Sequence, residues 1–390
     1  MIDIILKILK KELFNKDSEF GEINWNDVWK ETRVQAIGTL VFSGAGKCGF
    51  QFDEDTQNKA ANQLARINRS FMGHKRIANI LEGAEIPYVI IKGVVSSSYY
   101  PDPYVRPMGD VDVLVKKEDL KKACELFKSK GFTIKKEDVD FDEKHHMNFK
   151  MGNQSIELHF DLPGVPDNDM RDEVRSLADD IFEKSVDYDS IYGKIKGTSP
   201  FHHGLIMLLH MQGHMQNGGM GLRHLCDWAV FVNSFKENEF VSVFKEKLES
   251  IGLWYFACLM CQTSEYIGLE HKEWMGNDEE MAKILLDDIT SGGNFGRKDD
   301  KRMNSARYLP KVQEGKRRKT QLGQYISYGI DITPKIFPFF KKHRWLMPIG
   351  FICYCFRTAY RLITRKSKFY DLSENNKRYD VYSKLKLFEK

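Results

Sequence analysis

The segment Gly109–Val115, with the sequence GDVDVLV, is the feature that most limits what this chain can fold into. Acidic residues alternate with valines in it, and alternate side chains of a β-strand point to opposite faces of the sheet. We therefore expect Asp110, Asp112 and Leu114 to share one face and the three valines to be buried on the other. Two carboxylates about 6–7 Å apart at Cα repel each other, and a divalent cation held between them relieves that repulsion. The alternative is that both aspartates lie on the solvated face of an edge strand.

A second segment, residues 155–161 with the sequence SIELHFD, offers a third acidic group. As a strand it would place Glu157, His159 and Asp161 on one face and three apolar side chains on the other. Hard cations such as Mg²⁺ or Mn²⁺ take oxygen ligands from carboxylates and from substrate phosphates. We expect the two aspartates and Glu157 to hold such a cation, with Glu157 as the third ligand or as a base. His159 and Asp161 remain alternatives for that third position.

The residues that precede the acidic strand have the character of a phosphate-binding loop. A short apolar run, residues 88–91, is closed by Lys92 and Gly93, and a helix is expected to start at Val94. A glycine here lets backbone N–H groups approach a phosphate closely, and a helix N-terminus favours anions. Arg106 can bind a phosphate through two parallel hydrogen bonds. The residues expected to contact a nucleotide are Lys92, Gly93, Ser96, Arg106, Gly109 and His159.

Hydrophobic periodicity divides the chain into four parts. Residues 1–85 and 166–295 repeat their apolar side chains at helical spacing, and a β-hairpin around residues 191–193 interrupts the second of these parts. Residues 86–165 contain short apolar or alternating runs that indicate strands. Residues 296–390 form a basic, aromatic-rich C-terminal extension. The pattern predicts an α+β fold, with the strands in the middle and helices on both sides.

Several of these segments together resemble the uncharacterised nucleotidyltransferase family, which belongs to the DNA-polymerase-β-like nucleotidyltransferase superfamily. The residues that carry the resemblance are Ile91-Lys-Gly93, Tyr99-Tyr-Pro101, Arg106-Pro107, Gly109–Val115, Ile156-Glu-Leu-His159 and, in the helical half, His210–His214 and Leu222–Asp227. The resemblance implies a small mixed β-sheet nucleotidyltransferase core, flanked by N-terminal helices and a C-terminal helical domain. The superfamily usually opens its site with a Gly-Ser or Gly-Gly pair. Here Lys92-Gly93 takes that place, and 16 residues separate Gly93 from Asp110.

The resemblance also implies an activity. A nucleoside monophosphate would pass from a nucleoside triphosphate (NTP) to an acceptor hydroxyl, with release of pyrophosphate. Asp110 and Asp112 would bridge two metal ions, and Glu157 would share one of them. Family members are often found among genes for surface polysaccharides, which implies a small-molecule, glycan or lipid-linked acceptor. Modification of a protein side chain or of RNA is an alternative within this fold. A non-catalytic adaptor that binds a membrane surface or nucleic acid through its basic tail is the alternative from another class.

Charge is distributed unevenly along the chain. The net charge is +4, but residues 301–390 hold 22 of the 59 Lys and Arg residues and 6 of the 55 Asp and Glu residues, so they carry +16 and residues 1–300 carry −12. Residues 335–366 mix basic with aromatic side chains, which suits the headgroup layer of a membrane. The expected partner is an anionic membrane surface. A helix packed on the acidic body and a solvated tail are alternatives, and nucleic acid is less favoured. Seven cysteines without the spacing of a zinc module indicate a reduced compartment. We therefore expect a cytoplasmic protein, peripheral at the inner membrane face.

The helical region contains two further polar pairs. His210 and His214 are four residues apart, as in His-x-x-x-His metal sites, but the glutamate of the zinc-protease signature does not follow His210. Metal binding, packing and substrate contact are the interpretations left open. Arg223 and Asp227 have the same spacing, so they could pair on a helix surface or contact the substrate.

Overall fold

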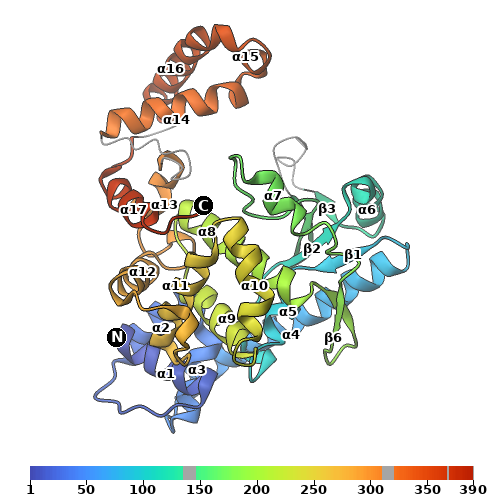
Figure 1. Ribbon diagram of the computed structural model, residues 1–390, viewed down its shortest axis with the longest axis vertical. Coiled ribbons are helices and arrows are strands. Elements are labelled where there is room, and N and C mark those ends of the chain that lie inside the picture. The colour runs from blue at the N-terminus through green and yellow to red at the C-terminus, as the bar shows by residue number, and fades with distance from the viewer. Residues whose placement is uncertain (135–145, 310–319, 367–368, 390) are drawn as a thin grey trace.

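The computed structural model describes residues 1–134, 146–309, 320–366 and 369–389 (Figure 1). The first part is helical, as the sequence predicted, and consists of α1 (Ile2–Phe14), α2 (Trp25–Val34), α3 (Gly38–Lys47) and the long α4 (Glu54–Glu82). The Asp53 carboxylate caps α4, since it accepts a hydrogen bond from the Thr56 N–H at 2.7 Å. Apolar residues of α4 pack against the sheet that follows.

The described residues form a seven-stranded mixed sheet with the strand order β3-β4-β5-β2-β1-β7-β6. The strands are β1 (Tyr88–Ile90), β2 (Val111–Val115), β3 (Thr133–Ile134), β4 (His146–Met151), β5 (Gln154–His159), β6 (Val186–Tyr188) and β7 (Ile195–Gly197). Strand β2 is antiparallel to β1 and parallel to β5, and β1 is parallel to β7. The α+β class predicted from the sequence is confirmed.

The sheet extends beyond residue 165, where the sequence placed the end of the strand-forming part. The predicted hairpin around residues 191–193 is present as β6 and β7, which are antiparallel. It does not stand alone, because Ile90 of β1 pairs with Gly197 of β7. The residues that form a hairpin turn are adjacent in the sequence, whereas β1, with which β7 pairs, lies about a hundred residues earlier. The periodicity of the chain therefore revealed the hairpin but not its place in the sheet.

The two faces of the sheet pack against different helices. The three valines of β2 are buried in a core with residues of α4 and α6 (Leu120–Ser129), whereas Leu114 belongs to the core of the helical part. This confirms the alternation predicted for the acidic strand. Asp112 points with Leu114 toward the helical part, and it pairs in register with Glu157 of the parallel strand β5. The register thus places two carboxylates side by side on the face that the helices cover.

The helical part that covers this face is built from α7 (Arg171–Ser176), α8 (Pro200–Gln216), α9 (Leu222–Asn233), α10 (Glu239–Ser250), α11 (Trp254–Ser264), α12 (Glu279–Gly292) and α13 (Asp300–Ser305). The short helix α5 (Val94–Ser97) follows β1, and its valines belong to the core of the other face. Near the C-terminus, α17 (Ser373–Ser383) returns to the helical part. Arg378 of α17 donates a hydrogen bond to the Met215 carbonyl of α8 at 2.9 Å. The end of the expected C-terminal extension is therefore packed on the body.

Residues 320–366 of the extension, all of which the structure describes, form three α-helices at one end of the molecule (Figure 1). These are α14 (Gln321–Ile336), α15 (Pro338–Lys342) and α16 (Met347–Ile363), and α14 and α16 lie side by side. Of the helices in the described ranges, none combines the length and the hydropathy needed to span a bilayer.

Candidate active site

Asp112 lies at the centre of a buried polar cluster. Its side chain is close to three groups from two further elements: Lys92 Nζ and His159 Nε2 are each 3.3 Å from Asp112 Oδ1, and Glu157 lies on the adjacent strand. His159 Nε2 is also 3.4 Å from Glu157 Oε2, so this imidazole lies between the two carboxylates. The Asp112 residue as a whole is only 9% exposed. The structure therefore brings together Lys92, Asp112, Glu157 and His159, four of the residues named from the sequence.

The electrostatics of the cluster favour a charged Asp112. Burial by itself would raise the pKa of Asp112, but the Lys92 ammonium group and the hydrogen bond from His159 outweigh it and hold this pKa well below its usual value. Burial in turn lowers the pKa of His159, but its hydrogen bonds to Asp112 and Glu157 raise it overall. The cluster thus keeps a carboxylate ionised in a largely dry place, where it is available as a ligand for a cation.

All nine residues predicted from the sequence line one cavity of about 670 Å³ between the sheet and the helices α8 and α9. They are Lys92, Gly93, Ser96, Arg106, Gly109, Asp110, Asp112, Glu157 and His159. Asp161 is excluded from this cavity, because β5 ends at His159 and the alternation of faces ends with it. The Asp161 carboxylate instead makes an ion pair with Arg175. Among the three alternatives for a third cation ligand, Glu157 and His159 remain.

The backbone conformation and close packing at position 93 require a glycine. Its φ of +63° is a conformation that favours glycine, and a Cβ atom built on it would lie 2.0 Å from His74 Nε2. His74 is buried, and its Nδ1 atom lies 2.8 Å from the Ser70 carbonyl. Burial lowers the pKa of His74 to about 4, so the imidazole is neutral at pH 7. The loop after β1 therefore packs tightly against α4.

Arg106 lines the cavity as expected from the sequence, but its guanidinium group is already paired. Its Nε and Nη2 atoms each donate a 2.7 Å hydrogen bond to Asp227 of α9, and Nη1 donates to the Gly93 carbonyl at 3.4 Å. Tyr100 donates a third hydrogen bond to Asp227, at 2.6 Å. Arg106 is 4% exposed. The guanidinium group that was expected to clamp a phosphate is thus engaged in a buried ion pair between the sheet part and the helical part.

Residues 21–267, well over half of the chain, match the sequence model of a family described as uncharacterised nucleotidyltransferase. The chain belongs to the uncharacterised nucleotidyltransferase family. Searches of curated proteins and of solved structures each found no match. The matched residues include all nine predicted site residues as well as α8 and α9. The resemblance stated from the motifs is therefore confirmed, and it supports nucleotidyl transfer as the general activity.

The helical wall of this nucleotidyltransferase cavity carries basic residues whose role the sequence did not reveal. Arg223 of α9 lines the cavity, and its Nε atom is buried without a hydrogen-bond partner in the described part of the chain. Burial, together with the charge of Arg106, lowers the pKa of Arg223. Arg66 and Arg297 also line the cavity. The spacing of Arg223 and Asp227 suggested a pair on one helix, but Asp227 bonds to Arg106, so Arg223 is not paired with Asp227 and lines the cavity.

The residues present fit a divalent cation of the hard type. Asp112 and Glu157 are neighbours on parallel strands, and Asp110 lines the same cavity, so three carboxylates border it. Two closely spaced groups of ligand atoms occur in the described residues: His146, Glu157 and His159 form one, and His210, His214 and His224 form the other. In each group the ligand atoms lie within 4.8 Å of one another. Glu157 therefore belongs both to the three carboxylates that line the cavity and to the group with His146 and His159.

Proposed function

We propose that this chain transfers a nucleoside monophosphate from an NTP to a hydroxyl group of a small-molecule, glycan or lipid-linked acceptor, in surface polysaccharide biosynthesis. The observation that carries the proposal is the convergence of all nine predicted residues on one cavity, with Asp112 and Glu157 in register. Mg²⁺ or Mn²⁺ would be held by Asp110, Asp112 and Glu157. Such a cation, when bound, neutralises phosphate charge and lowers the pKa of the attacking hydroxyl.

The residues of the chain have separate parts in this reaction. The acceptor oxygen attacks the α-phosphorus, the bond from that phosphorus to the pyrophosphate oxygen breaks, and the hydroxyl proton passes to the Glu157 carboxylate. His159 holds the Asp112 and Glu157 carboxylates in place through its Nε2 atom. Lys92 and Arg223 stabilise the negative charge that develops on the departing pyrophosphate. Arg223 replaces Arg106 in this role, because Arg106 is committed to Asp227.

Nucleotide binding is tested first by thermal unfolding with each of the four NTPs, with and without Mg²⁺. We expect one NTP to raise the free energy of unfolding by about 2.7 kcal/mol when it is present at a hundredfold excess over its Kd. The increase should require Mg²⁺ and should be absent in Asp110→Asn. Asp161→Asn is the matched control, because Asp161 belongs to the same acidic pattern but lies outside the cavity. Equal stabilisation of both variants, or none by any nucleotide with Mg²⁺, would contradict the proposal.

The C-terminal helices favour an acceptor at a membrane surface. On α16, five large apolar or aromatic side chains are exposed at helical spacing, so they form one continuous stripe: Ile349, Ile352, Phe356, Tyr360 and Ile363. Phe356 is 74% and Ile363 is 82% exposed. Arg357 and Arg361 lie one turn apart beside this stripe, and Arg365 follows just after the helix ends at Ile363. An apolar stripe beside a basic row is the pattern of a helix that lies in the headgroup layer of a membrane.

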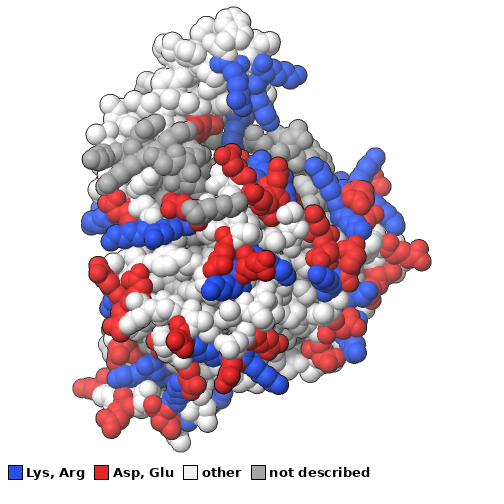
Figure 2. All heavy atoms as spheres, in the orientation of Figure 1, with Lys and Arg blue, Asp and Glu red and all other residues white. Residues whose placement is uncertain are grey.

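Charge complementarity favours an anionic lipid bilayer as this surface. Residues 320–366 contain eight basic residues and one acidic residue. Figure 2 shows this end of the molecule as mostly uncharged atoms with a group of Lys and Arg side chains beside them. A lipid-bound α16 would keep the chain at the membrane face, where a lipid-linked or nascent glycan acceptor is found. The adaptor alternative requires the same surface but no nucleotide, so the thermal experiment separates the two.

Vesicle binding tests the membrane surface directly. We expect the protein to sediment with vesicles that contain phosphatidylglycerol and not with vesicles of phosphatidylcholine alone. Replacing Arg357, Arg361 and Arg365 together with Gln should weaken binding by roughly 100-fold, since each basic residue near the surface contributes about 1 kcal/mol. Phe356→Glu should also weaken it, whereas Ile191→Glu, on an exposed isoleucine of the β6–β7 hairpin, serves as the control.

Equal binding to both kinds of vesicle would contradict this assignment. A second outcome that overturns it is a change in oligomeric state. If Phe356→Glu converts a dimer into a monomer in sedimentation analysis, the stripe is an interface between two copies of the chain.

A further inference from the structure

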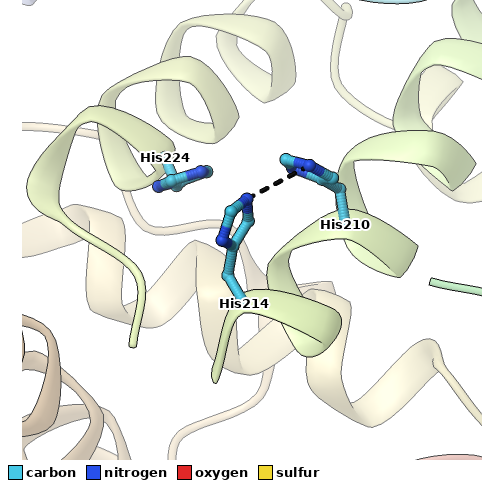
Figure 3. Close-up of side chains that lie close together, drawn as sticks. All are labelled: His210, His214 and His224. Carbon is cyan, nitrogen blue, oxygen red and sulfur yellow. Dashed lines mark hydrogen bonds between the residues drawn. The ribbon is translucent and has the colours of Figure 1, made fainter. Parts of the chain in front are cut away.

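Three histidines from two helices converge on the helical wall of the cavity. His210 and His214 lie one turn apart on α8, and His224 lies in the first turn of α9, so the rings face one another (Figure 3). The ring centroids are 4.1 Å apart for His210 and His214 and 4.8 Å apart for His214 and His224. Their nearest ligand nitrogens all lie within 4.8 Å of one another. The spacing that suggested a metal site in the sequence therefore has a third histidine in the structure.

The three histidines make few of the hydrogen bonds that buried histidines with a purely structural role usually make. His214 Nε2 and His210 Nε2 lie 3.1 Å apart, and the latter lies 2.7 Å from Lys92 Nζ. Both ring nitrogens of His224 are buried, and neither meets hydrogen-bond geometry with a partner in the described parts of the chain, although the Gly221 carbonyl opposes the effect of burial on the pKa of this ring. A buried polar atom without a partner carries a desolvation cost. A ring nitrogen that makes no hydrogen bond and lies close to two other imidazoles is instead suited to bind a metal ion.

The chemistry of the three side chains selects the ion. Burial, with the charge of Lys92 nearby, lowers the pKa of His210, and burial lowers the pKa of His214 to about 3. Burial likewise lowers the pKa of His224, so all three rings are neutral at pH 7 and offer lone pairs. Three neutral imidazoles suit Zn²⁺, which is bound by nitrogen ligands in tetrahedral geometry. They do not suit Mg²⁺, which prefers oxygen. The cluster is thus chemically distinct from the carboxylates on the opposite wall.

We propose that His210, His214 and His224 bind a zinc ion whose fourth coordination position opens to the cavity. All three residues line that cavity, so the fourth ligand is water or an oxygen of a bound substrate. The site goes beyond nucleotidyl transfer, since the carboxylates alone supply the metal ligands of that reaction. It gives the cavity a metal ion on the helical wall, in addition to the cation expected at the carboxylates, for binding an anionic or hydroxyl-bearing molecule.

Lys92 provides a specific signature for this site. Its ammonium group is 2.7 Å from His210 Nε2 and 3.3 Å from Asp112 Oδ1, so it competes with a metal for the first atom and can remain bonded to the second. An ammonium group this close also repels a cation. Lys92→Met should therefore bind zinc more tightly than the unmodified protein, whereas zinc bound far from Lys92 would not respond to this change. Lys92 also lies near His159 through Asp112, so the second group of ligand atoms is separated from this site by Glu157→Gln rather than by Lys92→Met.

The test measures zinc itself and uses no nucleotide. The full chain is stripped with a chelator and titrated with Zn²⁺ alone, and the bound metal is counted by elemental analysis. Co²⁺ is then added in place of Zn²⁺ to obtain the visible spectrum of a tetrahedral site. We expect one ion per chain and a loss of affinity of roughly 100-fold in His224→Gln. His271→Gln is the control, because His271 is half-exposed and pairs with Glu265 instead.

Glu157→Gln should leave zinc binding unchanged, which separates this site from the group of His146, Glu157 and His159. If His224→Gln unfolds, as judged by circular dichroism, His214→Gln replaces it. The proposal is overturned if the chain binds no zinc, or if zinc binding survives both histidine substitutions. It is equally overturned if the cobalt spectrum is octahedral. None of these outcomes depends on whether the chain transfers nucleotides.

Discussion

Asp112→Asn is expected to lower the rate of nucleotidyl transfer by roughly 1,000-fold or more. The substitution keeps the size of the side chain but removes the charge that the cluster is built to maintain, since Lys92 and His159 hold the pKa of Asp112 well below its usual value. Loss of a charged group that stabilises the transition state costs two to three orders of magnitude, and a bridging metal ligand contributes at least as much. Transfer of label from an NTP labelled at the α-phosphate to material in a cell-envelope extract measures the rate.

The fold of this variant must be checked separately, because Asp112 is buried beside a lysine. The asparagine side chain retains an oxygen that can accept a hydrogen bond from Lys92, so we expect a cooperative melt at a lowered midpoint. Glu157→Gln is the companion variant, as its side chain is more exposed than that of Asp112 and the residue lies on the neighbouring strand. Asp161→Asn should retain full activity. A normal rate in both Asp112→Asn and Glu157→Gln would rule out the carboxylates as metal ligands.

Local periodicity explains which parts of the site could be predicted from the sequence. The alternation of Asp110 and Asp112 with valines requires only a strand, and the same rule placed Glu157 and His159 on one face. The rule failed at Asp161, because it assumes that the strand continues, and β5 ends two residues earlier. The α+β class was likewise predictable, since helical and strand periods alternate along the chain.

The parts that escaped prediction depend on contacts between distant segments. The partner of Arg106 is 121 residues away, and no spacing rule connects the two. His224 joins His210 and His214 only because α8 and α9 pack together, and β7 joins the sheet only through β1. Tyr100, Arg106 and Asp227 were all part of the family motifs. Their convergence suggests that the motif preserves a link between the two parts of the molecule as well as the chemistry of the cavity.

Asp227→Asn, which breaks the buried ion pair between the sheet part and the helical part, is expected to lower the free energy of unfolding by about 3–5 kcal/mol. Removing one partner of a buried ion pair leaves the other charge uncompensated, and this costs more than the pair contributed. Arg106 and Asp227 are 4% and 8% exposed, so water does not replace the lost partner. Tyr100 loses its charged acceptor as well. Urea denaturation at pH 7 measures the change. Asp3→Asn is the control, because the Lys7–Asp3 pair is exposed and contributes little.

A double variant and a pH series distinguish this explanation from a simple packing defect. Arg106→Met with Asp227→Leu removes both charges, so it should be less destabilised than the sum of the two single variants. Burial alone would raise the pKa of Asp227, but Arg106 outweighs it and lowers this pKa below the ordinary value of about 3.9. The stabilisation is therefore complete above about pH 4 and declines as the pH falls through the lower, folded-state value. The difference in the free energy of unfolding between the unmodified chain and Asp227→Asn should therefore decrease in that acidic range. Two results together would show that the ion pair does not hold the sheet and the helices together. The difference in the free energy of unfolding would stay constant as the pH falls, and the destabilisation of the double variant would equal the sum of the two single variants.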